Sequence, residues 1–108
     1  MKHDSDRIDR LRLDEPAADL PVILAAASSY LDLPIDGETA AIGEVGLTGE
    51  VRAVSYLELR LQELHRLGFR RVLVPAQGTA SLLAPEGMQL VRVKSIREAI
   101  QTALKAEH

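Results

Sequence analysis

Basic side chains around the end of a predicted helix are the residues with the clearest potential for chemistry. Arg66, Arg70 and Arg71 surround Gly68, and Lys94 lies further along the chain. Gathered near one edge of a fold, such cations could contact nucleic-acid phosphates. The alternative is that they stabilise the carboxyl end of a helix, where positive charge is favourable. We favour this alternative because three arginines with Phe69 as the one aromatic residue among them make a weak signal for base stacking and nucleic-acid binding. DNA contact at the four residues is kept as a prediction.

Motifs for nucleophilic, metal or nucleotide chemistry are missing from the sequence. There is no GxxxxGK, HExxH or GxSxG pattern, and the absence of cysteine excludes disulfides and thiolate metal sites. The three histidines are scattered, and two of them lie near the ends of the chain: His3, His65 and His108. Ser28 and Ser29 lie in an alanine-rich helix with no base at matching spacing, which favours helix packing over a nucleophile. We therefore expect no metal and no cofactor.

Composition and charge indicate one small domain. The chain has 108 residues, of which 46% are apolar and only 3% aromatic, so its core must be aliphatic. Thirteen lysines and arginines against 16 aspartates and glutamates argue against coating nucleic acid or an anionic membrane through net charge. Residues 1–7 are polar and expected to be flexible, and 20–33 are too short and interrupted to cross a bilayer. The sequence predicts a soluble, cytoplasmic protein without a membrane partner.

A glycine-rich β-hairpin forms the centre of the predicted fold. The runs Thr39–Val45 and Glu50–Val54 flank a break at Leu47–Gly49, as in a hairpin. Before it, Asp14-Glu15-Pro16 signals a helix that runs to Leu31. Pro21 indicates a late start or a kink in that helix. The apolar residues of this helix lie on nearly all of its sides, which predicts a central helix packed on several sides.

Further elements complete an α/β arrangement. Ser55 with Glu58 forms a capping box for a helix that Gly68 ends, and Ser95 caps a final helix. Near-alternating apolar residues predict a short strand at Ile8–Leu13, and the run RRVLVP at Arg70–Pro75 predicts a short buried strand of parallel type. A further strand is predicted at Met88–Val93. The order is a strand, a helix, a hairpin, a helix, a strand, a strand or loop, and a helix, which predicts a single α/β domain with a mixed sheet.

Several separated motifs resemble one known family. DEPAADLPVILAAASSYLDLP, GEVGLTGEVRAV, LGFRRVLVPA and APEGMQLVRVKSIREAI follow each other as in the C-terminal Lon-protease-like domain of the bacterial DNA repair protein RadA, also called Sms. The motifs cover about residues 11–104, and we assign 8–104 to a partial domain of this kind within the single domain 1–108. The resemblance implies a ribosomal-protein-S5-domain-2-like α/β fold that assembles as a hexamer.

The resemblance also implies partners. In RadA the domain follows a zinc finger and a RecA-like ATPase, and neither is in this sequence; the opening segment of the Lon-like domain is missing as well. We therefore expect self-association, contact with DNA, and a RadA ATPase portion encoded elsewhere. An edge left open by the missing segment invites pairing with another chain. The expected contact is the edge of the strand Ile8–Leu13 or the face of the hairpin.

Lon proteases use a serine and a lysine, and by the resemblance these positions fall on Ala17 and Arg60. Alanine has no nucleophilic oxygen and arginine stays protonated, so the peptidase roles are lost. For Arg60 we favour a solvated side chain over an ion pair across a subunit boundary with Glu15 or Asp19. The predicted function is a non-catalytic, RadA-like scaffold in recombinational DNA repair. The alternatives are a Lon-type ATP-dependent serine peptidase and a truncated remnant without independent function.

Overall fold

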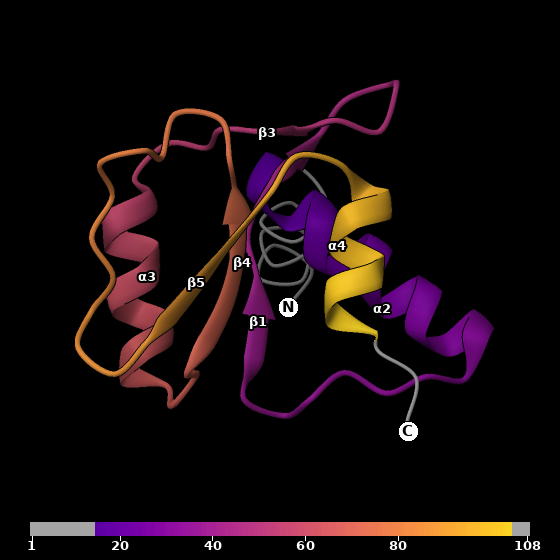
Figure 1. The fold of residues 1–108 in the computed structure, drawn as a ribbon, viewed down its shortest axis with the longest axis horizontal. Coiled ribbons are helices and arrows are strands. Elements are labelled where there is room, and N and C mark those ends of the chain that lie inside the picture. The colour runs from indigo at the N-terminus through magenta and orange to yellow at the C-terminus, as the bar shows by residue number, and fades with distance from the viewer. Residues whose placement is uncertain (1–14, 105–108) are drawn as a thin grey trace, which may run out of the picture.

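A three-stranded parallel sheet forms the middle of the domain. The computed structural model describes residues 15–104. Its main sheet has the order β1-β4-β5, built from β1 (Thr39–Ala41), β4 (Arg71–Pro75) and β5 (Gln89–Val93) (Figure 1). A second, antiparallel sheet pairs β2 (Glu44–Val45) with β3 (Val51–Arg52). The mixed α/β fold predicted from the sequence is confirmed.

The central strand β4 is buried on both faces. Val72, Leu73 and Val74 are each 0% exposed. Because side chains alternate along a strand, Leu73 packs into one apolar cluster while Val72 and Val74 pack into another on the opposite face. A run of apolar residues is typical of a parallel strand with helices on both sides. The buried parallel strand predicted at Arg70–Pro75 is thus confirmed.

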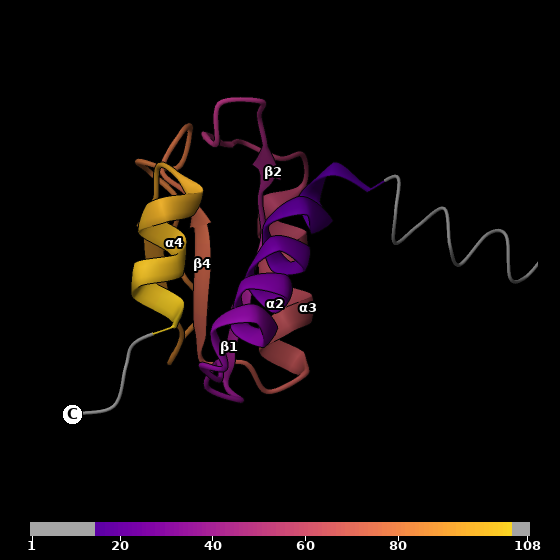
Figure 2. The ribbon, with the colours of Figure 1, turned by 90° about the vertical axis from the view of Figure 1, so that its right-hand side faces the viewer.

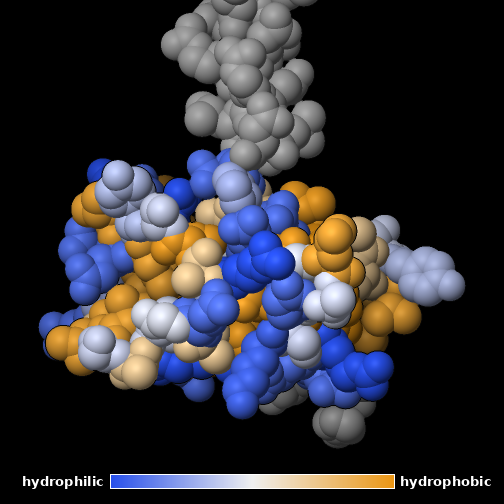
Figure 3. Space-filling view, turned by 90° about the horizontal axis from the view of Figure 1, so that it is seen from above, coloured by the Kyte–Doolittle hydropathy of each residue, from blue (hydrophilic) through white to orange (hydrophobic). Residues whose placement is uncertain are grey.

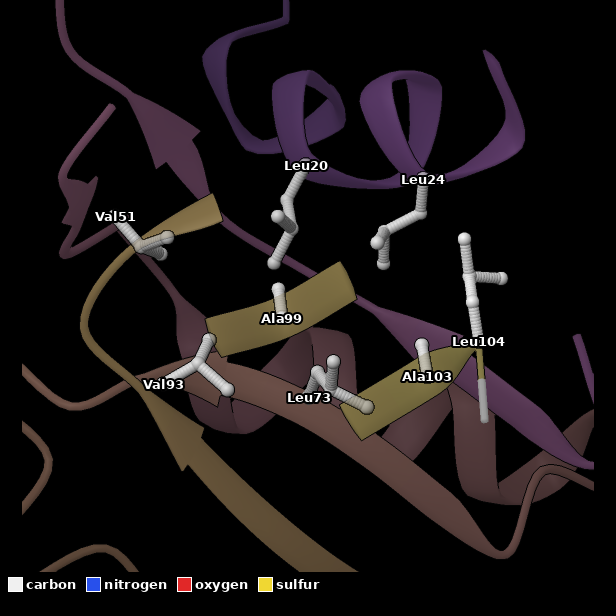
Figure 4. Packing of buried hydrophobic residues seen from close by; sticks show 8 residues of the cluster. All are labelled: Leu20, Leu24, Val51, Leu73, Val93, Ala99, Ala103 and Leu104. Carbon is white, nitrogen blue, oxygen red and sulfur yellow. The ribbon is translucent and has the colours of Figure 1, made fainter. Parts of the chain in front are cut away.

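Helices cover both faces of this sheet. On one face α2 (Asp19–Leu31) and α4 (Ile96–Ala103) pack together, with Leu20 and Leu24 meeting Ala99 and Ala103 (Figure 4). On the other face lies α3 (Leu57–Arg66), which contributes the buried Leu61. Figure 1 shows α3 on one side of the strands and the α2–α4 pair on the other.

The predicted hairpin is present but shorter than expected. The first predicted strand, Thr39–Val45, is two strands in the structure: β1 joins the parallel sheet, and only β2 pairs with β3. The division occurs at Gly43, whose N–H donates to Ala17 O at 3.0 Å and whose carbonyl accepts from Leu20 N–H at 2.9 Å. These bonds replace strand pairing at Gly43. The hairpin tip projects beyond the helices at one end of the molecule (Figure 2).

The first helix begins late and is exposed along one side. A 3-10 turn, η1 (Pro16–Ala18), precedes α2, so that Pro21 is the third residue of the helix and needs no kink. This confirms the predicted late start. The prediction of packing on several sides is wrong. Val22 and Tyr30 are 59% and 89% exposed, because α2 covers the sheet from outside and no described element covers its outer face.

The capping box predicted for α3 is wrong. The N-cap is Tyr56, which has a left-handed backbone with a φ of 60° and makes no side-chain capping bond. The predicted glycine end is confirmed: Gly68 has a φ of 102°, its N–H donates to His65 O, and Phe69 N–H donates to Leu64 O. This pair of bonds is the Schellman motif, which favours glycine at the left-handed position.

The last helix starts as predicted. Ser95 Oγ accepts from Glu98 N–H at 3.1 Å, and a Glu98 carboxylate oxygen accepts from Lys94 N–H at 2.8 Å. Before it, the segment between β4 and β5 forms turns and no helix. The buried Thr79 hydroxyl donates to Pro75 O at 2.7 Å, and the Arg92 guanidinium donates to Thr79 O at 3.0 Å, which ties this segment to β5.

Three sequence predictions concern segments at the start of the chain. The strand predicted at Ile8–Leu13, the flexibility predicted for 1–7 and the N-cap predicted at Asp14 lie outside the described residues. Within residues 15–104, no helix is long and apolar enough to span a bilayer.

Candidate functional site

A hollow beside the free edge of β1 brings Ala17 and Arg60 together. It has a volume of about 290 Å³. Ala17 belongs to η1, while Arg60 lies in the first half of α3. Eight residues line it, five of them apolar: Ala17, Ala18, Ala41, Ile42, Leu64, Glu15, Arg60 and Glu63. The two positions that the Lon resemblance points to therefore share one site, although 42 residues separate them in the chain.

Arg60 is held by two groups of its own chain. Its Nη2 lies 2.9 Å from Glu15 Oε1, and its Nε donates to Ser55 O at 2.9 Å. Both side chains of the ion pair are about one-third exposed. The favoured prediction of a solvated Arg60 is wrong. Glu15 was correctly named as a partner, but the pair lies within one chain. Asp19, the other acid considered, accepts from Val45 N–H at 3.0 Å.

Comparison with known proteins matches the chain to a family. The model of the Lon protease (S16) C-terminal proteolytic domain matches residues 11–106, nearly the whole chain. The chain belongs to this Lon proteolytic-domain family.

Similar curated proteins in several bacteria are named DNA repair protein RadA. The chain is 44% identical over 94 residues to RadA of Bacillus subtilis and 45% identical over 94 residues to RadA of Listeria monocytogenes. It is 46% identical over 92 residues to RadA of Mycolicibacterium smegmatis. These matches cover 85–87% of this chain but 19–21% of each relative. The chain thus spans about one-fifth of the length of these relatives, and it resembles the Lon-like domain of RadA as predicted.

The hollow of this Lon-family domain has no nucleophile among its lining residues. None of the eight carries a hydroxyl, thiol or imidazole group. Ala17 is 6% exposed and presents a methyl group, and the Arg60 guanidinium is neutralised by Glu15. A guanidinium that remains charged cannot accept a proton from a nucleophile. The lining of the hollow therefore offers apolar contact and an ion pair.

Ser28 and His65, both considered from the sequence, are tied to structural roles. Ser28 Oγ donates to Leu33 O at 2.6 Å, where the chain leaves α2. His65 Nε2 lies 2.9 Å from Glu86 O. His3 and His108 are outside the described residues. Among residues 15–104, no group of three or more histidines and acids could hold a metal ion.

The four basic residues do not gather at one place in this Lon-family domain. Arg71 and Lys94 lie at opposite ends of the sheet, because β4 and β5 are parallel and Arg71 pairs with Gln89 at their start. Arg66 forms an exposed ion pair with Glu63 at 2.5 Å. Arg71 donates to Thr102 O at 3.4 Å on the α4 side of the sheet. Lys94 thus lies apart from Arg71, and contact of Arg66, Arg70, Arg71 and Lys94 with DNA stays a prediction.

A hydrogen-bonded carboxylate at the hairpin tip was not predicted from the sequence. Glu50 accepts from the Thr48 hydroxyl, from Thr48 N–H at 3.2 Å and from Arg52 Nη2 at 2.8 Å. These bonds lower the pKa of Glu50 to about 2, and the bond from the Thr48 side chain has the largest effect. The sequence signal was the alternation of Thr48, Glu50 and Arg52, which brings the three side chains to one side of the hairpin. The bonds order the turn that presents Leu47 to solvent.

We expect Glu50 to titrate near pH 2 because its carboxylate form is hydrogen-bonded. A pKa below the ordinary value of 4.5 stabilises the folded state above pH 4.5, and this contribution disappears as the pH falls from about 4.5 to about 2. NMR titration of the Glu50 side-chain carboxyl carbon measures this pKa. In a Thr48→Val variant the midpoint should move up toward 4.5. A midpoint near 4.5 in the unchanged protein would contradict the bonding described.

Proposed function

We propose that this chain is a non-catalytic module of a RadA-like DNA repair protein. The observation that carries the proposal is the hollow in which Ala17 and Arg60 meet, at the positions where the resemblance puts the peptidase serine and lysine. The names of the bacterial relatives support a role in DNA repair. A domain that lacks its nucleophile can still serve as a folded scaffold for its neighbours. Such a module is expected in the cytoplasm, where bacterial DNA lies.

Assembly and DNA contact are further parts of the proposal. Self-association is supported by the large apolar side chains exposed on the described surface. DNA contact has less support, since Arg66 is paired with Glu63 and Lys94 lies away from the three arginines. A RadA ATPase portion stays the proposed partner, as the family resemblance implies.

The purified protein should not hydrolyse casein or fluorogenic peptides, with or without ATP. The reason is that the hollow has neither a hydroxyl nor a neutral amine among its lining residues. An active Lon-type protease in the same assay is the positive control. An Ala17→Ser variant should also be inactive, because Arg60 cannot act as a base. Hydrolysis that is lost on Ser28→Ala or Ser29→Ala would support the peptidase alternative and refute the proposal.

A domain exchange tests the repair function. The matching segment of Bacillus subtilis RadA is replaced by this domain, and survival of the bacteria after DNA damage is measured. We expect survival within about twofold of the unmodified strain, whereas RadA without the segment should be impaired. A hybrid that also carries Ala17→Ser and Arg60→Lys should survive equally well. A folded hybrid no better than the truncated protein would favour the remnant without function.

A further inference from the structure

A cavity lies where α2 and α4 end, beside the first residues of β1 and β4. Figures 1 and 2 show the carboxyl ends of both helices at the end of the sheet where these two strands begin. The cavity has a volume of about 410 Å³, which is within the usual range for small-molecule sites. It shares no lining residue with the hollow at Ala17 and Arg60. The apolar part of its wall consists of Leu33, Pro34, Ile35 and Ala103.

Arg71 brings a cation with unused hydrogen-bond donors to this cavity. Arg71 lies on the side of β4 that faces α2 and α4, because it precedes Leu73 by two positions and side chains alternate along a strand. Its Nη2 donates to Thr102 O at 3.4 Å, which is longer than an ordinary bond. A guanidinium has five N–H donors. No acid within residues 15–104 forms an ion pair with Arg71, so most of these donors are open to a ligand.

The hydroxyl of Thr39, beside Arg71, is buried and unpaired. Thr39 and Arg71 are register partners in β1 and β4, so their side chains project from the same face of the sheet. Thr39 is 8% exposed, and its Oγ1 has no hydrogen-bond partner among the described residues. Buried hydroxyls in proteins are ordinarily bonded, because an unpaired one is unfavourable. A ligand oxygen bound by Arg71 would supply the missing partner.

The charges around the cavity select the class of ligand. One guanidinium matches the two oxygens of a carboxylate in a bidentate pair. Asp36 also lines the cavity, and the carboxyl end of α4 at Thr102 carries partial negative charge. Both disfavour a doubly charged phosphate. The apolar wall suits an aliphatic body. Residues 105–108, which follow α4, include no leucine, isoleucine or valine to fill this wall, so a free molecule fits better than the chain's own end.

We propose that this cavity binds a small aliphatic monocarboxylate. Arg71 holds the carboxylate, Thr39 donates to one of its oxygens, and the apolar wall covers the aliphatic part. The site does not depend on the proposed repair function. Figure 3 shows the opposite end of the molecule, where β4 and β5 end, and apolar residues are mixed with hydrophilic ones on that surface. The test must therefore separate binding in the cavity from weak adsorption to such surface.

NMR titration of the intact chain with 4-methylpentanoate tests the site. The amide signals of Asp36, Arg71 and Thr102 should shift together and saturate, with a dissociation constant on the order of 1 mM. The neutral isostere 4-methylpentanamide should bind at least about fivefold more weakly, because it cannot form the charged pair. Inorganic phosphate should leave these signals unchanged. No saturation up to about 20 mM ligand, or binding of phosphate at least as tight, would overturn the proposal.

Replacing Arg71 tests the carboxylate contact. Arg71→Gln should raise the dissociation constant at least about tenfold. The matched control is Arg70→Gln, which removes the same charge one position away, where the side chain donates to Phe69 O. This control should change the constant less than about twofold, because an exposed charge outside the cavity contributes little. Circular dichroism and thermal melting verify that both variants are folded. Equal weakening by the two variants would mean attraction by net charge alone and refute the site.

Replacing Thr39 tests the buried hydroxyl. Thr39→Val keeps the shape of the side chain and removes its Oγ1. Without ligand the variant should be as stable as the unchanged chain or more stable, because the hydroxyl has no bond to lose. The dissociation constant for 4-methylpentanoate should rise about threefold or more. An unchanged constant, or a lower melting temperature without ligand, would contradict the role assigned to Thr39.

Discussion

Replacing Leu73 with alanine is expected to lower the free energy of unfolding by about 3 kcal/mol. Leu73 is 0% exposed at the centre of β4 and packs against α2 and α4 residues in one apolar cluster. The substitution leaves a cavity between strand and helices that the surroundings fill only in part. Because small domains have a total stability of about 5–15 kcal/mol, this is a large fraction. Urea denaturation followed by circular dichroism measures the change.

The matched control is Leu83→Ala in the segment between β4 and β5. Leu83 is 82% exposed, so the same loss of side-chain atoms should change the free energy of unfolding by less than about 0.5 kcal/mol. Equal losses for the two variants would mean that β4 is not the buried strand described.

The second large effect is expected at Gly43, where the two sheets meet. A Cβ added to this residue would lie 2.9 Å from Val51 Cγ1 and 3.3 Å from Leu20 Cδ2, both in buried side chains. Gly43→Ala should therefore destabilise the fold by about 1–3 kcal/mol through overpacking. Thermal and urea unfolding measure the effect. Val51→Ala removes the atom nearest to the added Cβ. The double variant should therefore lose less free energy of unfolding than the sum of the losses in the two single variants.

Gly37 provides the control for backbone entropy. It has no heavy atom within 4 Å of an added Cβ and no positive φ. Gly37→Ala should be neutral or stabilising by up to about 1 kcal/mol, because it restricts only the unfolded chain. If Gly43→Ala were as well tolerated as Gly37→Ala, the close approach of β3 and α2 at Gly43 would be wrong.

Local signals in the sequence determined several elements correctly. The apolar run Val72–Pro75 predicts a buried parallel strand, because a strand covered by helices on both faces needs apolar residues at successive positions. Gly68 ends α3 because a left-handed residue is needed there, and Ser95 with Glu98 begins α4 because both bond to nearby backbone. These features depend on neighbours within a few positions. The family motifs were also readable, since they run along the chain in order.

Other features depend on contacts between distant parts of the chain, and the tertiary structure alone decided them. Gly43 interrupts the first hairpin strand because η1 and α2 bond to its backbone, and the sequence does not show that approach. Arg60 pairs with an acid 45 positions away because α3 lies beside η1. The exposure of α2 is of the same kind: its apolar pattern indicates what can be buried, whereas the packing of the other elements decides which face is covered and leaves Val22 and Tyr30 in solvent.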